Sequence, residues 1–224
     1  MASLYVVATP IGNLGDVSER ALAALRDSSV IFAEDTRVTG KLTAHFGIRV
    51  SVRRYNEHAP DAAFRETRER LKRGENVALV SDSGTPGISD PGVKLVAFVA
   101  REAPNAKIVP IPGPSAAVAA LSVSGMPANE FTFLGFPPAK RKRKAFFARV
   151  AVADARPVVI YEAPHRIAKT LGELAEAVGE DVPVFVAREL TKMYEEHLRG
   201  TLGEVKKLLA EREKARGEFV IVVA

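Results

Sequence analysis

The chain of 224 residues contains no cysteine and no tryptophan. Without thiols it has no disulfides, no sulfur ligands for zinc or an iron–sulfur cluster, and no thiol nucleophile, so we expect a reducing compartment, the cytoplasm. No apolar run reaches the roughly 18 residues that a membrane-spanning helix needs. The start, Met1-Ala2-Ser3-Leu4, lacks the charged and apolar stretches of a secretory signal. We therefore expect neither a membrane segment nor export.

Several common site motifs are missing as well. The sequence has no Walker A loop, no Gly-x-Gly-x-x-Gly after the first predicted strand and no Gly-x-Ser-x-Gly elbow. These absences argue against a P-loop site, a dinucleotide-binding Rossmann site and a serine-hydrolase site. The histidines do not have the spacing of metal ligands, and we expect no metal site; they are His45, His58, His165 and His197.

Positive charge exceeds negative charge only slightly, because 32 Lys and Arg residues against 27 Asp and Glu residues give a net charge of +5. Ordinary surface charge explains this excess as well as an RNA-facing patch does. One run of five consecutive cations, followed by Phe146 and Phe147, favours the patch. We expect this run to bind RNA phosphates; its members are Lys140, Arg141, Lys142, Arg143 and Lys144.

Hydrophobic residues make up 47% of the chain and charged residues 26%, which is typical of a globular protein. Short apolar segments alternate with helical periodicity, and this alternation predicts an α/β protein. In the first half, the expected strands are residues 4–8, 29–33, 50–54, 77–81 and 107–111. In the second half, they are residues 131–135, 157–161, 183–187, 195–201 and 218–223.

The strands divide evenly about a predicted hinge, Gly125-Met126-Pro127. We expect two small α/β domains, residues 1–124 and 125–224, with the active site in the cleft between them. One continuous doubly wound sheet is the alternative. At the helix starts, Asp16 with Glu19 predicts a capping box, and Asp61 predicts an N-cap.

Four of the predicted strands end in Gly/Pro-rich loops or charge clusters, at residues 9–13, 34–37, 82–92 and 112–116. Ligands of open α/β sheets bind beyond the carboxyl ends of the strands. Glycine lets the backbone approach a ligand closely, and proline fixes the shape of a loop in advance. A tight turn explains any one of these loops, but four at one edge predict a binding site.

Eight motifs occur in order: TPIGNL (9–14), EDTR (34–37), NEH (56–58), SDSGTPGISDPG (81–92), IPGPSA (111–116), GFPP (135–138), YEAPHR (161–166) and RELTK (188–192). Together they closely resemble the bacterial small-subunit ribosomal RNA (cytidine-2′-O)-methyltransferases of the tetrapyrrole-methylase superfamily. The resemblance runs from Leu4 to the last residue. Members of that family generally continue for some tens of residues beyond the strand that ends here at residues 219–223. We therefore expect a small C-terminal appendage, which assists RNA docking, to be missing here.

The resemblance implies two α/β domains that bind S-adenosylmethionine, usually in a homodimer. It also implies a substrate: a cytidine in the decoding region of 16S rRNA within the 30S subunit, methylated at the ribose 2′-hydroxyl. Carried over position by position, the cofactor-binding residues are Ile11, Ser83, Gly84, Thr85, Ile88, Ser115, Ala116, Glu162 and Leu190. Thr85 stands where many tetrapyrrole methylases have aspartate, which favours the ribosomal RNA branch.

A sulfonium is already an activated leaving group, so the enzyme needs only to align the reactants and help remove the hydroxyl proton. The candidate bases are Glu34, Asp35, Glu57 and Glu189. The candidate contacts to phosphate and sugar are Arg37, His58, Arg166, Arg188 and Lys192. A salt-bridge network that joins Glu34 or Asp35 to an arginine explains these residues equally well, and the sequence does not select the base.

Two other functions compete with RNA methylation. One is C-methylation of a tetrapyrrole such as uroporphyrinogen or a precorrin, against which Thr85 and the EDTR and YEAPHR motifs argue. The other is a non-catalytic RNA-binding protein, against which the intact loops at 82–92 and 111–116 argue.

Overall fold

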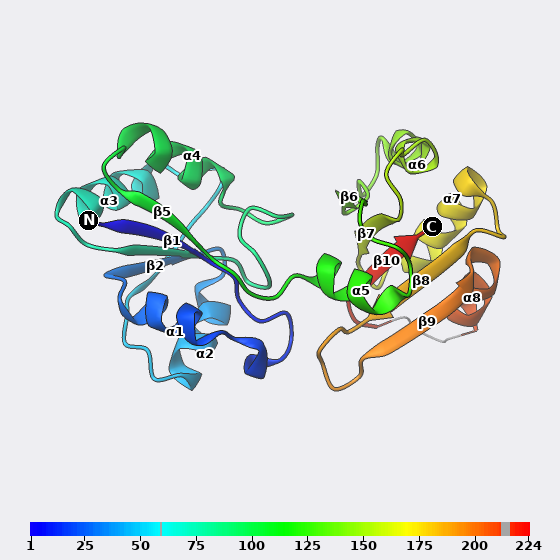
Figure 1. Cartoon of the computed structure of the whole chain (residues 1–224), viewed down its shortest axis with the longest axis horizontal. Coiled ribbons are helices and arrows are strands. Elements are labelled where there is room, and N and C mark those ends of the chain that lie inside the picture. The colour runs from blue at the N-terminus through cyan, green and yellow to red at the C-terminus, as the bar shows by residue number, and fades with distance from the viewer. Residues whose placement is uncertain (59, 212–215) are drawn as a thin grey trace. The chain divides into compact units, whose positions relative to one another are not determined.

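The computed structural model describes residues 1–58, 60–211 and 216–224, and the chain forms two compact units, Met1–Ser115 and Ala116–Ala224 (Figure 1). The units divide before helix α5 (Ala116–Ser124), not after it as the sequence predicted. The reason is that α5 packs on strands of the second unit. Its first turn is held there by a 3.0 Å hydrogen bond from the Ala117 N–H to the hydroxyl of Tyr161.

The first unit is built on a parallel five-stranded sheet in the order β3-β2-β4-β1-β5. Its strands are β1 (Ser3–Val7), β2 (Val30–Ala33), β3 (Val52–Arg54), β4 (Val77–Val80) and β5 (Lys107–Ile111). The connecting helices are α1 (Glu19–Arg26), α2 (Thr36–His45), α3 (Asp61–Lys72) and α4 (Val93–Glu102). Figure 1 shows α1 and α2 on one face of this sheet and α3 and α4 on the other.

Helices on both faces explain why the central strands are continuously apolar. Every residue of β2 and β4 is buried. Their side chains belong to two separate apolar clusters, one packed against α3 and α4 and the other against α1 and α2. Because all the strands are parallel, their carboxyl ends lie at one edge. The four loops that the sequence marked therefore do follow strands at the same edge of one sheet, as predicted.

Two predicted helix caps are wrong. Helix α1 is capped by Ser18, whose hydroxyl accepts a 3.1 Å hydrogen bond from the Ala21 N–H, while Asp16 ends the preceding 3₁₀ turn η1 (Leu14–Asp16). Asp61 is the first residue of α3 and makes no cap, because Pro60 occupies the capping position. Serine and aspartate are both common N-cap residues, so the spacing of residues alone could not decide between Ser18 and Asp16.

The second unit has a mixed sheet in the order β6-β7-β10-β8-β9, in which only β6 and β7 pair in parallel. Its strands are β6 (Thr132–Gly135), β7 (Val158–Glu162), β8 (Pro183–Arg188), β9 (Glu196–Thr201) and β10 (Phe219–Val223). Besides α5, its helices are α6 (Arg143–Ala151), α7 (Ile167–Val178) and α8 (Leu202–Ala210). Two separate sheets exclude the alternative of one continuous sheet.

The core of the second unit lies between its sheet and helices α6, α7 and α8, all of which contribute buried side chains to one apolar cluster. The last strand, β10, is completely buried at the centre of the sheet. Across residues 1–58, 60–211 and 216–224, no helix has the length and apolar character needed to span a bilayer.

Candidate functional site

The loops at the carboxyl edge of the first sheet are hydrogen-bonded to one another. Thr9 and Gly84 exchange two backbone hydrogen bonds of 2.9 and 3.1 Å, and the Thr9 hydroxyl donates to the Ser81 carbonyl at 3.0 Å. The loop after β5 joins them, because the Thr85 hydroxyl donates to the Pro114 carbonyl at 3.4 Å. The loops after β1, β4 and β5 therefore form one preorganised surface.

Two glycines shape this surface for different reasons. Gly84 has φ +84°, but a Cβ there would meet Ile11 and the Pro114 carbonyl only at 3.5 and 3.6 Å, so the backbone conformation selects glycine. Gly113 has an ordinary φ, but a Cβ there would lie 2.9 Å from the Cβ of Ala8. Close approach of the loop to the end of β1 selects glycine at that position.

The remaining cofactor candidates are divided between the units. In the first unit, Ser83 and Ile88 are exposed, Ile11 is buried, and the half-buried Thr85 directs its hydroxyl to the Pro114 carbonyl. Ser115 ends the first unit, and Ala116 begins the second; both are half-buried. Leu190 is buried in the second unit at 9% exposure.

Glu162 differs from the other cofactor candidates because its side chain has no exposed area. Its carboxylate pairs with Arg166 at 2.6 Å and accepts hydrogen bonds from the Ala163 N–H and the Thr170 hydroxyl. These partners are all in the second unit and enclose the carboxylate. The Glu162 side chain therefore supports the fold of its unit, and its contact with adenosine stays a prediction.

A polar hollow of about 350 Å³ lies where β2, β3 and β4 end. It is lined by Glu34, Asp35, Thr36, Arg37, Arg54 and Asp82. Asp35 caps α2 by accepting the Arg37 N–H at 2.8 Å, and the Arg37 guanidinium closes on the same carboxylate at 2.6 Å. Hydrogen bonds from the side chain and backbone of Arg37 hold the pKa of Asp35 far below its usual range.

Two other candidate bases also have structural partners. The Glu57 carboxylate accepts from the Tyr55 hydroxyl at 2.7 Å and from the Gly92 N–H at 3.0 Å. Burial raises the pKa of Glu57, but these hydrogen bonds outweigh burial, and the net shift is downward. Glu57 therefore attaches its own loop to the loop that precedes α4.

Glu189 has a positive φ of +53° and a carboxylate engaged by two neighbours. It accepts from the Lys192 ammonium at 2.7 Å and from the Glu218 N–H at 2.9 Å. Burial again acts to raise its pKa, and Lys192 with the Glu218 N–H brings the net pKa below the ordinary value. Among the described residues, Glu34 alone of the four candidate bases is exposed and has neither a hydrogen bond nor an ion pair.

The basic run does not form a uniform patch. Lys140, Arg141, Lys142 and Lys144 are exposed, but Arg143 is buried at 5% exposure. Its guanidinium pairs with Glu173 and donates to the Thr170 hydroxyl and the Pro138 carbonyl. Unlike the other four cations, Arg143 is directed inward against α7, so we do not include it among the exposed cations of this run.

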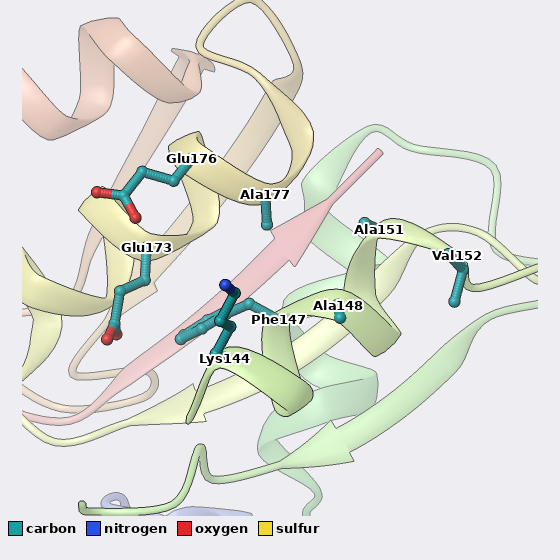
Figure 2. A pocket seen from close by; sticks show the side chains of 8 residues that line it. All are labelled: Lys144, Phe147, Ala148, Ala151, Val152, Glu173, Glu176 and Ala177. Atoms are coloured by element: carbon teal, nitrogen blue, oxygen red, sulfur yellow. The ribbon is translucent and has the colours of Figure 1, made fainter. Parts of the chain in front are cut away.

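A larger hollow, of about 590 Å³, lies between α6 and α7. Figure 2 shows Lys144 on the α6 side and Glu173 and Glu176 on the α7 side, above an apolar base that includes Phe147. Two carboxylates and one ammonium line this hollow, so its charge does not favour an RNA phosphate.

The other candidate RNA contacts differ in their exposure and in whether they are paired with carboxylates. His58 is exposed, and Arg37 is exposed although it pairs with Asp35. Arg166 is largely enclosed by Glu162 and the Pro137 carbonyl, while Arg188 pairs with Glu196 and Lys192 with Glu189 and Glu218.

The sequence singled out neither Arg54 nor Asp82 as a functional residue, although Asp82 lies in the marked loop 82–92. Both lie where ligands of α/β sheets bind, beyond the carboxyl ends of strands, because Arg54 ends β3 and Asp82 follows β4 by two positions. Gly/Pro loops and charge clusters are the sequence signals of such a site, and the single arginine that ends the three-residue strand β3 is neither.

Comparison with known proteins decides the family. The family model for Tetrapyrrole (Corrin/Porphyrin) Methylases matches residues 3–206. The chain belongs to this family. Its fold agrees with solved tetrapyrrole methylases: it is similar to the methyltransferase CobJ (TM-score 0.73, 18% identity, 100% of this chain and 94% of that one). It is also similar to the cobalt precorrin-4 methyltransferase CbiF (TM-score 0.68, 18% identity, 98% and 94%).

Within the tetrapyrrole methylases, the sequence is much closer to proteins named ribosomal RNA small subunit methyltransferase I. The protein of that name from Xylella fastidiosa (strain Temecula1) is 49% identical over 99% of this chain and 81% of its own length. Those from Synechocystis and Escherichia coli O157:H7 are 44% and 42% identical, over 100% and 98% of this chain and 79% and 77% of their own lengths. The resemblance seen in the motifs is confirmed.

Proposed function

We propose that this chain is an S-adenosylmethionine-dependent methyltransferase that acts on small-subunit ribosomal RNA. The observation that carries the proposal is identity of 42–49% to proteins named for that activity, over nearly the whole chain. The acceptor is the ribose 2′-hydroxyl of a cytidine in the decoding region of 16S rRNA, as the motifs imply. The proposal includes action on the 30S subunit in the cytoplasm, by a homodimer.

The cofactor residues fit a bound S-adenosylmethionine in the first unit. Ser83, Gly84, Thr85 and Ile88 lie in the loop after β4, and Ile11 in the loop after β1, at the edge where α/β sheets bind ligands. The hydrogen bonds between these loops fix the surface in advance, which reduces the entropic cost of binding. Ser115, Ala116 and Leu190 complete the proposed set, and Glu162 supports its own unit.

Bound S-adenosylmethionine supplies a methyl group on a positively charged sulfur. The protein has two tasks: it holds the ribose oxygen in line with that methyl group, and it accepts the hydroxyl proton. Of the four carboxylates considered, Glu34 is the one that keeps an unpaired acceptor at the sheet edge within the described chain. Asp35, Glu57 and Glu189 hold the loops in place.

RNA binding is assigned to exposed cations. These are Lys140, Arg141, Lys142 and Lys144 in the second unit, together with Arg37 and His58 in the first. The half-buried Arg188 and Lys192, which are paired with carboxylates, complete the proposed set. Within residues 1–58, 60–211 and 216–224, no three His, Asp or Glu side chains are grouped as metal ligands.

Methyl transfer from radiolabelled S-adenosylmethionine tests the proposal. The purified chain is incubated with 30S subunits that lack ribose methylation, with naked 16S rRNA, or with uroporphyrinogen. We expect label in the RNA of the 30S sample. Label in uroporphyrinogen alone would favour the tetrapyrrole C-methyltransferase, and cofactor-independent RNA binding with no transfer would favour the non-catalytic alternative.

A further inference from the structure

The polar hollow at the ends of β2, β3 and β4 contains two groups of opposite charge without partners. Glu34 and Arg54 both line it, both are exposed, and neither has a hydrogen bond or an ion pair with any described residue. Most other charged side chains near this edge are paired, as Asp35 is with Arg37. Unpaired charges of both signs that share a hollow are available to a ligand.

The neighbouring arginine shows that Arg54 is a special case. Arg53 and Arg54 are consecutive in β3, so their side chains leave opposite faces of the strand. Arg53 pairs with Glu66 of α3 at 3.3 Å, whereas Arg54 lies in the hollow with Glu34 and Asp82. The same residue type thus has an internal partner on one face and none on the other.

The walls of the hollow are fixed in place. The Asp35 N–H donates to the Asp82 carboxylate at 3.0 Å, which ties the loop after β2 to the loop after β4. The pair of Asp35 with Arg37 then holds the start of α2. Because these contacts use Asp35 and one oxygen of Asp82, ligand binding is left to Glu34, Arg54 and the exposed edge of Arg37.

The size and charges of the hollow fit one ribose with its phosphate. A volume of about 350 Å³ is at the lower end of the range for small-ligand sites. A guanidinium binds a phosphate with two parallel hydrogen bonds, and a carboxylate accepts a hydrogen bond from a sugar hydroxyl. A ligand with only negative charge would be repelled by Asp35 and Asp82, whereas a nucleotide offers both an anion and hydroxyl donors.

The hollow also adjoins the proposed methyl-donor loop. Asp82 lines it and is directly followed by Ser83, Gly84 and Thr85, and adjacent Cα atoms are only about 3.8 Å apart. We propose that this hollow binds the ribose–phosphate of the target nucleotide, with Arg54 on the phosphate and Glu34 on the 2′-hydroxyl. The inference rests on the proposed function and adds the substrate site to it.

The transfer step balances with these groups. The bond from the methyl carbon to the ribose oxygen forms as the bond from that carbon to sulfur breaks, and the sulfur keeps the electron pair. The hydroxyl proton passes to the Glu34 carboxylate, which releases it to water. Glu34 is therefore a catalytic residue in this proposal, and Arg54 is a substrate-binding residue.

The phosphate role of Arg54 is tested by Arg54→Gln, with Arg53→Gln as the matched control, since each removes one charge from β3. For Arg54→Gln we expect the Kd for 30S subunits to rise about tenfold and the slope of log affinity against log salt to fall by about 0.7–0.9. Arg53→Gln should match the parent in both, and Arg54→Lys should recover part of the loss. Equal behaviour of the two glutamine variants would overturn the assignment.

The proton role of Glu34 is tested by Glu34→Gln, with the exposed Glu130→Gln as the control. Single-turnover methyl transfer by Glu34→Gln should slow by about 100-fold or more, while S-adenosylmethionine affinity and 30S affinity stay near the parent values. A rate equal to that of Glu130→Gln would contradict it. An active parent with unaffected Arg54 and Glu34 variants refutes only this site, whereas a parent that transfers no methyl to RNA refutes the proposed function itself.

Discussion

Individual residues in this protein owe their roles to partners that are distant in the sequence. Glu57 and Gly92 are far apart in the chain, yet one hydrogen bond joins them. Asp35 and Glu34 are adjacent, but the first is fully engaged and the second is free. The sequence identified all four candidate carboxylates and could not rank them, because the ranking depends on these long-range contacts.

At Gly84, the backbone conformation leads to a prediction about cofactor binding. Gly84→Ala places a Cβ on a residue with φ +84°. The control Gly74→Ala places one on a residue with φ +80°, which lies between α3 and β4, away from the carboxyl ends of the strands. Both variants should lose about 1 kcal/mol of stability, but only Gly84→Ala should weaken S-adenosylmethionine binding. Calorimetry without added metal measures this. Equal cofactor affinities in the two variants would remove Gly84 from the donor site.

At Glu57, the lowered pKa leads to a prediction about acid stability. A carboxyl group whose pKa is lower in the folded state stabilises the fold above its unfolded pKa of about 4.3, and this contribution is lost as pH falls through the folded-state pKa. The melting temperature of Glu57→Gln should therefore be below that of the parent at pH 7, and the difference should shrink towards pH 3. A difference independent of pH would mean that packing, not charge, is lost.

At the scale of elements, strand order and loop position followed from hydrophobic patterning. All ten strands lie within a residue or two of the predicted ranges, and the sheet edge carries the marked loops. What patterning missed was which side of a helix faces the core. The five consecutive cations share one charge but not one environment, since α6 turns Arg143 towards α7 and leaves its neighbours in solvent.

Arg143 of α6 binds Glu173 and Thr170 of α7, and these contacts lead to a prediction about stability. Arg143→Met removes a buried cation from Glu173 and leaves the fully buried Glu162 nearby with one partner fewer. We expect the free energy of unfolding to fall by about 3–5 kcal/mol. In the exposed control Lys144→Met, the change should stay within about 0.5 kcal/mol. Urea unfolding measures the free energy of unfolding of both variants. Similar small losses in Arg143→Met and Lys144→Met would show that the buried ion pair contributes little to stability.

The exposed members of the basic run lead to the complementary prediction. Replacing Lys140, Arg141, Lys142 and Lys144 with serine leaves Arg143 and the fold intact. Each lost phosphate contact should lower the salt slope of RNA binding by about 0.7–0.9, and cofactor affinity should not change. Titrations at several salt concentrations measure both quantities. An unchanged slope would make this segment ordinary solvated surface.

At the scale of the whole molecule, the fold and the family were accessible from sequence. Two α/β units follow from the alternation of strands and helices, and the eight motifs pointed to the tetrapyrrole methylases, which the family match confirmed. The division between the units was less accessible, because nothing in the small residues of α5 says which sheet they pack on. The polar hollow required coordinates, since β3, β2 and β4 are neighbours only in the folded sheet.

Nucleoside analysis of the methylated RNA tests the central claim, that this protein methylates a ribose oxygen of small-subunit rRNA. Subunits labelled with the purified chain and S-adenosylmethionine are digested to nucleosides and separated by liquid chromatography with mass detection. We predict one labelled product, 2′-O-methylcytidine, which is absent from reactions with Glu34→Gln at short times. Label on a base, on another nucleoside, or in no RNA product at all would contradict the account.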